Sequence, residues 1–251
     1  MTTFKNNSYY IDNMGFKIID LQNILTVLEQ QNKTINELSL VELGEQEFKV
    51  DNDQLTNPLI KTFVESNPRE WSNKQMGRKG YYSKDYFKTI CKDVVTIDIV
   101  SKCEGTFNLD LGLEFNVGTQ FDIVTNLGTT EHVGQITDNS PNPQYYAFKN
   151  IHNLAKVGGL IFHNVPYGNM KKLQKHGAFN YDNNFFVEMA NKLNYTIIYN
   201  RKVKRGNLIV VECCLQKNDD NFISEDEFNK IKGVYVTSLC KPKIKTFFMS
   251  L

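Results

Sequence analysis

The chain has 251 residues with 41% hydrophobic content, which fits one large α/β domain or two small ones. Its formal net charge of +1 excludes a general electrostatic attraction to nucleic acid or to an anionic membrane. The five cysteines form no CxxC pair, and the start MTTFKNNSYYIDN lacks the apolar core of a signal peptide. We therefore predict a cytoplasmic globular protein with reduced thiols, no membrane span and no bound metal ion.

The first third of the chain combines short apolar runs with a long polar segment. Apolar residues at helical spacing predict a helix over 20–31. Residues 38–41 read as a short strand that ends at Gly44. The weakly patterned residues 49–80 are expected to form a lid-like insertion with a helix near 59–66.

The remainder alternates strands with helices. Gly158 and Gly159 are expected to form the C-cap of one helix, and a turn at 202–207 joins the last two strands as an antiparallel hairpin. This alternation predicts an α/β fold with a mainly parallel sheet and helices on both faces. Strands are predicted at 94–99, 107–111, 121–126, 160–165, 195–200 and 208–215, and helices at 83–91, 143–156, 183–193 and 224–232.

Residues 121–132, FDIVTNLGTTEH, organise the chain. A buried strand is followed by a turn of small residues and then by polar groups. In an open α/β sheet, ligands bind at the carboxyl ends of the strands. We therefore expect a site there, in a central domain over 38–216 that lies between an N-terminal helical extension over 1–37 and a C-terminal tail over 217–251.

The order of these signals resembles that of class I S-adenosylmethionine (SAM)-dependent methyltransferases. The resemblance spans 38–215 and implies a Rossmann-like three-layer sandwich, in which a seven-stranded sheet ends in a reversed hairpin strand. It also implies SAM as methyl donor and S-adenosylhomocysteine as product. Five segments carry it: VELGEQ (41–46), VTIDI (95–99), NLDL (108–111), FDIVTNLGTTEHV (121–133) and IHNLAKVGGLIFHNVP (151–166).

The resemblance also assigns positions to the methyl donor. Glu42 and Gly44 match the start of the family's acidic, glycine-rich loop, whose N–H groups would meet the SAM carboxylate on the way into a helix. Gln46 and Phe48 replace the second and third glycines of that loop. Asp98, at a strand end, matches the ribose-binding acid. The other expected contacts are Asp110 and Leu111 at the adenine, and Asn126, Gly128 and Thr129 along the methionine part.

Methyl transfer to a hydroxyl or an amine requires removal of a proton, and histidine is the usual base near neutral pH. His132, His163 and His176 are the candidates, with Glu131 as an orienting group or a SAM contact. Each histidine alone is more often structural, but we expect at least one of the three to contact the acceptor. The expected acceptor is a small molecule or a glycan-type compound, methylated at oxygen.

Three alternatives remain at this stage. The changed glycine loop could mark a catalytically impaired, SAM-binding partner subunit. Residues 164–167, NVPY, mimic a motif with which some nucleic-acid methyltransferases hold a flipped base, although the motif stands after a different strand there. A nicotinamide-dependent enzyme would need GxGxxG after the first strand, and GEQEFK does not supply it.

Overall fold

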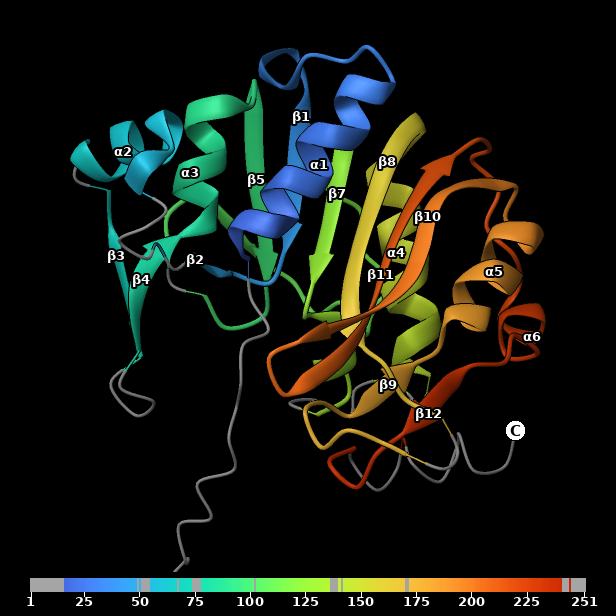
Figure 1. Ribbon diagram of the computed structural model, residues 1–251. Coiled ribbons are helices and arrows are strands. Elements are labelled where there is room, and N and C mark those ends of the chain that lie inside the picture. The colour runs from blue at the N-terminus through green and yellow to red at the C-terminus, as the bar shows by residue number, and fades with distance from the viewer. Residues whose placement is uncertain are drawn as a thin grey trace, which may run out of the picture.

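A mainly parallel sheet of seven strands forms the centre of the computed structural model (Figure 1). The structure describes residues 16–48, 50, 55–66, 68–73, 78–101, 103–135, 140, 142–169, 172–240 and 244. The strand order is β10-β11-β8-β7-β1-β5-β6. The strands are β1 (Ser39–Leu43), β5 (Asp93–Asp98), β6 (Thr106–Asn108), β7 (Phe121–Leu127), β8 (Ala155–Pro166), β10 (Tyr195–Arg205) and β11 (Leu208–Lys217).

The pairing of the strands confirms the predicted fold class. From β6 to β8 all neighbouring strands are parallel, and β11 runs antiparallel to both β8 and β10. The chain moves from β1 towards β5 and β6, and then returns to the other side of β1 with β7 and β8. The point where the strand order reverses therefore lies between β1 and β7, where doubly wound sheets bind ligands.

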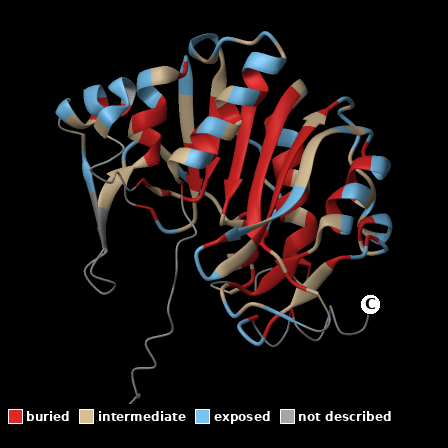
Figure 2. Cartoon of the chain, viewed as in Figure 1, coloured by how far each residue is buried: buried red, intermediate tan, exposed pale blue. Residues whose placement is uncertain are grey.

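Helices cover both faces of the sheet (Figure 1). One face packs against α1 (Ile18–Gln30), α2 (Pro58–Glu65) and α3 (Ser83–Ile90). The other packs against α4 (Pro143–Leu154), α5 (Asn183–Lys192) and the short α6 (Glu225–Phe228). The central strands are buried on both sides, as Figure 2 shows, because neighbouring residues such as Ile123 and Val124 enter opposite cores. The three layers predicted from the sequence are present.

The predicted glycine C-cap of α4 is wrong. The helix ends at Leu154, Ala155 already has an extended backbone, and Gly158 and Gly159 lie inside β8. The end of the helix is instead held by a buried lysine from β11. Lys217 Nζ donates to the carbonyl oxygens of His152 (2.9 Å) and Ala155 (2.8 Å), which satisfies acceptors that the helix leaves open.

The described part of the insertion contributes two strands to a second, smaller sheet. The short strand β2 (Glu47–Phe48) pairs with β4 (Arg78–Tyr82), which pairs with β3 (Glu70–Asn73). Phe48 is fully buried, and its ring lies 4.9 to 6.1 Å from those of Phe16, Phe63 and Tyr86. The replacement of a loop glycine by Phe48 therefore anchors this insertion to the core.

The two chain ends also pack on the domain where they are described. Helix α1 supplies four apolar side chains to one core, so residues from 18 onward form a layer of the sandwich rather than an extension. In the tail, β12 (Val234–Val236) pairs with β9 (Phe179–Tyr181), and the helix predicted at 224–232 covers only 225–228. Residues 1–15 and most of 241–251 lie outside the described part. No helix within the described ranges is long and apolar enough to cross a membrane.

Candidate functional site

A cavity of about 220 Å³ opens at the carboxyl ends of β1, β5 and β7, beside the point where the strand order reverses. This is the sheet edge at which the sequence predicts the site. The structure brings seven of the nine predicted cofactor residues to the wall of this cavity. They are Gly44, Gln46, Asp98, Asp110, Leu111, Gly128 and Thr129, and the predicted catalytic residue His132 lies beside them.

Two hydrogen bonds beside the cavity connect the loops that follow β1 and β7. Thr129 Oγ1 donates to the carbonyl oxygen of Leu43 (2.5 Å), and Gln46 Nε2 donates to Thr129 Oγ1 (3.1 Å). Gly44 lies next to these hydrogen bonds with φ +71°, and a Cβ on it would lie 2.6 Å from Thr129 Oγ1. A glycine is therefore required at 44, and the side chain of Gln46 fixes the loop where the family has a second glycine.

Asp98 joins the loop after β1 to the loop after β5. Its Oδ2 accepts the N–H of Glu45 (2.9 Å), and its Oδ1 accepts the N–H groups of Val100 (2.8 Å) and Ser101 (2.9 Å). A carboxylate offers about four acceptor positions. Three are taken by the backbone, which leaves capacity for one further donor.

Glu45 is a cavity residue that the sequence reasoning missed. Its Oε2 accepts a hydrogen bond from Ser101 (2.8 Å), and its Oε1 lies 3.4 Å from the ammonium of Lys84, whose side chain is fully buried. A second carboxylate thus stands on the same wall as Asp98. Its position next to Gly44 was the available signal.

A large part of the cavity lining is apolar. Ile97, Ile99, Val100, Leu109, Leu111 and Val133 all belong to this part. Asp110 turns the chain there, because its Oδ1 accepts the N–H of Gly112 (2.8 Å). An apolar lining with a few placed polar groups is typical of sites for small molecules and cofactors.

Glu42 does not reach the cavity surface. It is fully buried on β1, and burial raises its pKa to about 8. Ser83 Oγ donates to Glu42 Oε1 and to the carbonyl oxygen of Gln46, and the Ser83 N–H also donates to that carbonyl. The expected passage from glycine loop into helix is therefore wrong. Strand β2 follows the loop. The insertion separates β2 along the chain from α3, which begins at Ser83, next to the loop.

Two other predicted residues also lie away from the cavity, in the core. Asn126 Oδ1 accepts the N–H of Thr130 (3.1 Å), and its Nδ2 lies 3.0 Å from His163 Nδ1. His163 is 2% exposed, and burial lowers its pKa to about 3. Its ring packs against Phe186 with centroids 4.9 Å apart. The structure thus makes His163 a neutral core residue and does not bring it to the cavity.

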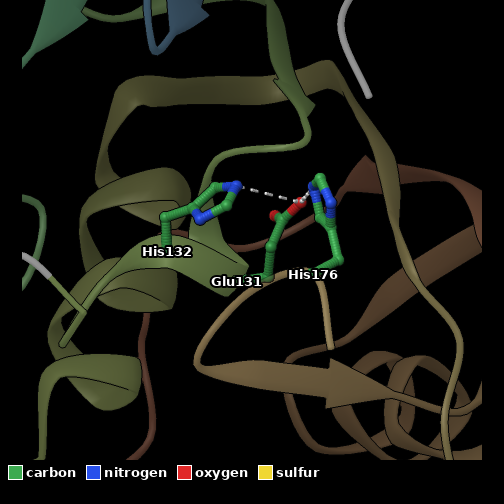
Figure 3. A group of neighbouring side chains, drawn as sticks. All are labelled: Glu131, His132 and His176. Carbon is green, nitrogen blue, oxygen red and sulfur yellow. Dashed lines mark ion pairs between the residues drawn. The ribbon is translucent and has the colours of Figure 1, made fainter. Parts of the chain in front are cut away.

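Glu131, His132 and His176 form one group, which we call the EHH cluster (Figure 3). The short helix η3 (Thr130–His132) carries the first two residues, and the loop before β9 carries the third. The Nε2 atoms of His132 and His176 lie 3.9 and 3.6 Å from Glu131 Oε1. The Glu131 side chain is fully buried, and burial raises its pKa to about 7, although nearby His132 lowers it in part.

The EHH cluster borders the cavity, because His132 belongs to both. Its side chain is 35% exposed, and its Nδ1 lies 2.8 Å from Gln135 Oε1. Neither carboxylate oxygen of Glu131 has a hydrogen-bond partner within the described ranges. The cavity therefore adjoins a compact group of nitrogen and oxygen electron-pair donors.

The NVPY segment does not form a base-binding motif. Asn164 is buried and donates through Nδ2 to Asp20 Oδ1 (3.1 Å) on α1. The ammonium of Lys202 lies 3.6 Å from the centre of the Tyr167 ring. The amide nitrogen and the ring that would hold a flipped base already have partners in the protein.

Comparison with known proteins gives structural similarity only. No family model and no curated protein match the sequence. The 1,6-didemethyltoxoflavin-N1-methyltransferase of Burkholderia thailandensis, solved with S-adenosylhomocysteine, is 12% identical over 80% of this chain and 84% of its own, with a TM-score of 0.46. The N-methyltransferase NodS of Bradyrhizobium japonicum, also solved with S-adenosylhomocysteine, is 9% identical over 80% and 87%, with a TM-score of 0.43.

The sugar N-methyltransferase KedS8 of Streptoalloteichus is 11% identical over 91% of this chain and 87% of its own, with a TM-score of 0.34. Similarities this distant assign no reaction and no substrate to this chain. The sheet order establishes a Rossmann-like α/β fold independently of them. The function has to be argued from the site.

Proposed function

We propose that the protein is a SAM-dependent methyltransferase that acts on a small-molecule or sugar-type acceptor at oxygen. One observation carries the proposal. A single cavity at the reversal of the strand order is lined by the glycine loop after β1, by Asp98, by Asp110 with apolar side chains, and by His132. SAM has a charged amino-acid end, a ribose and an adenine, and the first three parts of this lining suit these groups in that order.

The loop from Gly44 to Gln46, with Thr129, would hold the methionine end. Asp98 would accept one ribose hydroxyl with its remaining acceptor position, and Asp110 with the apolar wall would hold adenine. His132, which lines the same cavity, would face the methyl group and the acceptor. The protein would thus align the acceptor oxygen with the sulfonium methyl, and the EHH cluster would promote the loss of the acceptor proton.

The experiment is calorimetric titration of the purified full-length chain with SAM and with S-adenosylhomocysteine. Saturable binding of both at one site per chain is expected. Transfer of labelled methyl from SAM to a panel of polyhydroxylated small molecules and sugars would then identify the acceptor class. A chain that binds neither ligand under conditions in which it is folded would refute the proposal.

The alternatives make different demands. A catalytically impaired partner subunit would bind S-adenosylhomocysteine and transfer no methyl group without its partner. A nicotinamide enzyme lacks support, because β2 rather than a helix N-terminus follows the first loop. A nucleic-acid enzyme that uses Asn164 and Tyr167 lacks support because both side chains are engaged elsewhere.

A further inference from the structure

We propose that the EHH cluster binds one divalent transition-metal ion of the class of zinc, manganese or iron(II), at the wall of the cavity. The ligands would be the carboxylate of Glu131 and the Nε2 atoms of His132 and His176. Metal binding itself does not depend on the proposed function, but the role given to the ion below does. The sequence shows no metal-ligand spacing here, because His176 lies far along the chain from the other two residues.

The first argument is the spacing of the three donors. The Nε2 atoms lie 3.9 and 3.6 Å from Glu131 Oε1, which is too long for a hydrogen bond. All the donor atoms lie within 4.8 Å of one another. A metal ion with bonds of about 2.0–2.2 Å holds its ligand atoms roughly 3–3.5 Å apart. Small side-chain rotations would close the three residues on one ion.

The second argument is the hydrogen bond behind His132. The amide oxygen of Gln135 only accepts, so it assigns the ring proton to Nδ1, 2.8 Å away. The lone pair of Nε2 then points towards the carboxylate, as Figure 3 shows. A histidine that donates from one nitrogen to a carbonyl while the other nitrogen binds a cation is the usual arrangement at metal sites.

The third argument is the cost of Glu131. Its side chain is fully buried, and neither oxygen has a hydrogen-bond partner within the described ranges. A buried carboxylate without partners is costly, and one proton shared with one histidine would leave the second histidine facing another electron-pair donor. One cation satisfies all three groups together.

The fold holds these groups close together. A Cβ on Gly177 would lie 2.6 Å from the carbonyl oxygen of Glu131 and 2.7 Å from its Cγ, so only glycine lets the loop of His176 approach. Thr237 in the tail holds this loop from behind, since its Oγ1 donates to the carbonyl oxygen of Gly177 (2.6 Å). The N–H of Thr237 donates to the carbonyl oxygen of Ala178 (2.8 Å).

The donor set selects the class of ion. Two imidazoles and one carboxylate suit zinc, manganese and iron(II), whereas magnesium and calcium prefer oxygen ligands throughout. Three protein ligands leave coordination positions open. Because His132 is part of the cavity wall, these positions would face the acceptor.

The ion would bind an acceptor hydroxyl and lower its pKa. The O–H bond would break with release of the proton to water. The oxygen would form its bond to the methyl group while the S–CH₃ electron pair returns to sulfur. The products are the methyl ether, S-adenosylhomocysteine and one proton, so no oxidant or reductant is required. The favoured acceptors are hydroxyl compounds with a second oxygen able to chelate the ion.

The test is metal binding by the stripped full-length chain. The protein is treated with EDTA, dialysed and titrated with Zn²⁺, Mn²⁺ and Co²⁺, with metal content measured by mass spectrometry and Co²⁺ coordination by absorbance. One equivalent per chain is expected. Glu131→Gln and His176→Ala should each weaken binding at least about 100-fold. Gln135→Ala, which removes only the support of His132, should weaken it about 10- to 100-fold.

Glu42→Gln is the matched control, because it is the same substitution at another fully buried carboxylate. It should retain the metal, and the partly exposed His132→Ala should lose it with the least risk to folding. Absence of stoichiometric metal from the wild-type chain, or retention of metal by Glu131→Gln, would overturn the proposal. S-adenosylhomocysteine binding is measured on the same samples. Metal binding without ligand binding would refute the proposed function and leave the metal site intact. Ligand binding without metal binding would refute the metal site and leave the proposed function intact.

Discussion

The two ends of the cavity differ in whether the protein itself supplies hydrogen-bond partners for the polar groups there. At the ends of β1 and β5, Asp98 accepts three backbone N–H groups, and Gln46 bonds to both Leu43 and Thr129. After β7, the carboxylate of Glu131 is buried next to two histidines and has no hydrogen-bond partner within the described ranges.

We interpret this difference as a separation between residues that shape the cavity and residues that are available for chemistry. Polar groups that are satisfied by the protein itself fix the loops and thereby define a cavity before any ligand enters. A buried group left without a protein partner costs roughly 1–3 kcal/mol or more, and such groups persist where a ligand or a reaction uses them. Under the proposed function, the first end would position the cofactor and the second would serve the acceptor chemistry.

Asp98→Ala is the strongest test of the positioning end. The substitution removes the acceptor of three backbone N–H groups and the proposed ribose contact, and each hydrogen bond to a charged group contributes about 1.5–3 kcal/mol. S-adenosylhomocysteine affinity, measured by calorimetry, should fall at least about 100-fold. Asp93→Ala, at the exposed start of the same strand, is the control and should bind normally. Normal binding by Asp98→Ala would show that the ligand lies elsewhere.

Gly44→Ala tests whether the loop needs its close contact as well as its backbone conformation. Gly118 has almost the same positive φ (+73° against +71°), but nothing lies within 4 Å of its would-be Cβ. Gly118→Ala should therefore cost only the left-handed backbone, about 1–2 kcal/mol. Gly44→Ala should cost about 1–3 kcal/mol more, because the methyl group meets Thr129 Oγ1. Denaturant unfolding measures both, and equal losses would contradict the close contact between Gly44 and Thr129.

Glu42 gives the positioning end a pH dependence. Its pKa is raised from 4.5 to about 8 by burial, so the folded protein keeps a proton that the unfolded chain releases. The free energy of unfolding should therefore fall as the pH rises from about 5 to about 8. Glu42→Gln cannot ionise and should make this fall smaller, as measured by urea unfolding at pH 5 and pH 8. An unchanged slope in the variant would mean that Glu42 is already ionised in the folded state.

Much of the fold could be predicted from the sequence, because apolar strands that alternate with helices allow few arrangements. The insertion could not. Its polar residues show no clear period, and its strands β3 and β4 are stabilised by pairing with each other and with β2 rather than by a hydrophobic pattern. The short strand at 106–108 was expected to run to 111, where Asp110 instead turns the chain.

The site was predictable to the extent that it follows strand ends. Gly44, Asp98 and Thr129 all lie near the carboxyl end of a predicted strand, and all line the cavity. His163 was harder to place, because a strand that is buried on both faces shows no alternation to tell which face a side chain joins. The meeting of His176 with Glu131 depends on the return of a distant loop, which no local pattern reveals.

His163→Asn should have the smallest effect on ligand affinity, and it tests whether the core acts independently of the two ends of the cavity. His163 lies 3.0 Å from Asn126 Nδ2 and packs on Phe186, and its lowered pKa of about 3 keeps it neutral. The variant should lose about 1–3 kcal/mol of stability through the poorer packing. Its affinities for S-adenosylhomocysteine and for metal should stay within about twofold of the wild type. A folded variant with impaired binding would show that the turn after β7 is set from within the core, through Asn126 and Thr130, and that the acceptor end is not independent of it.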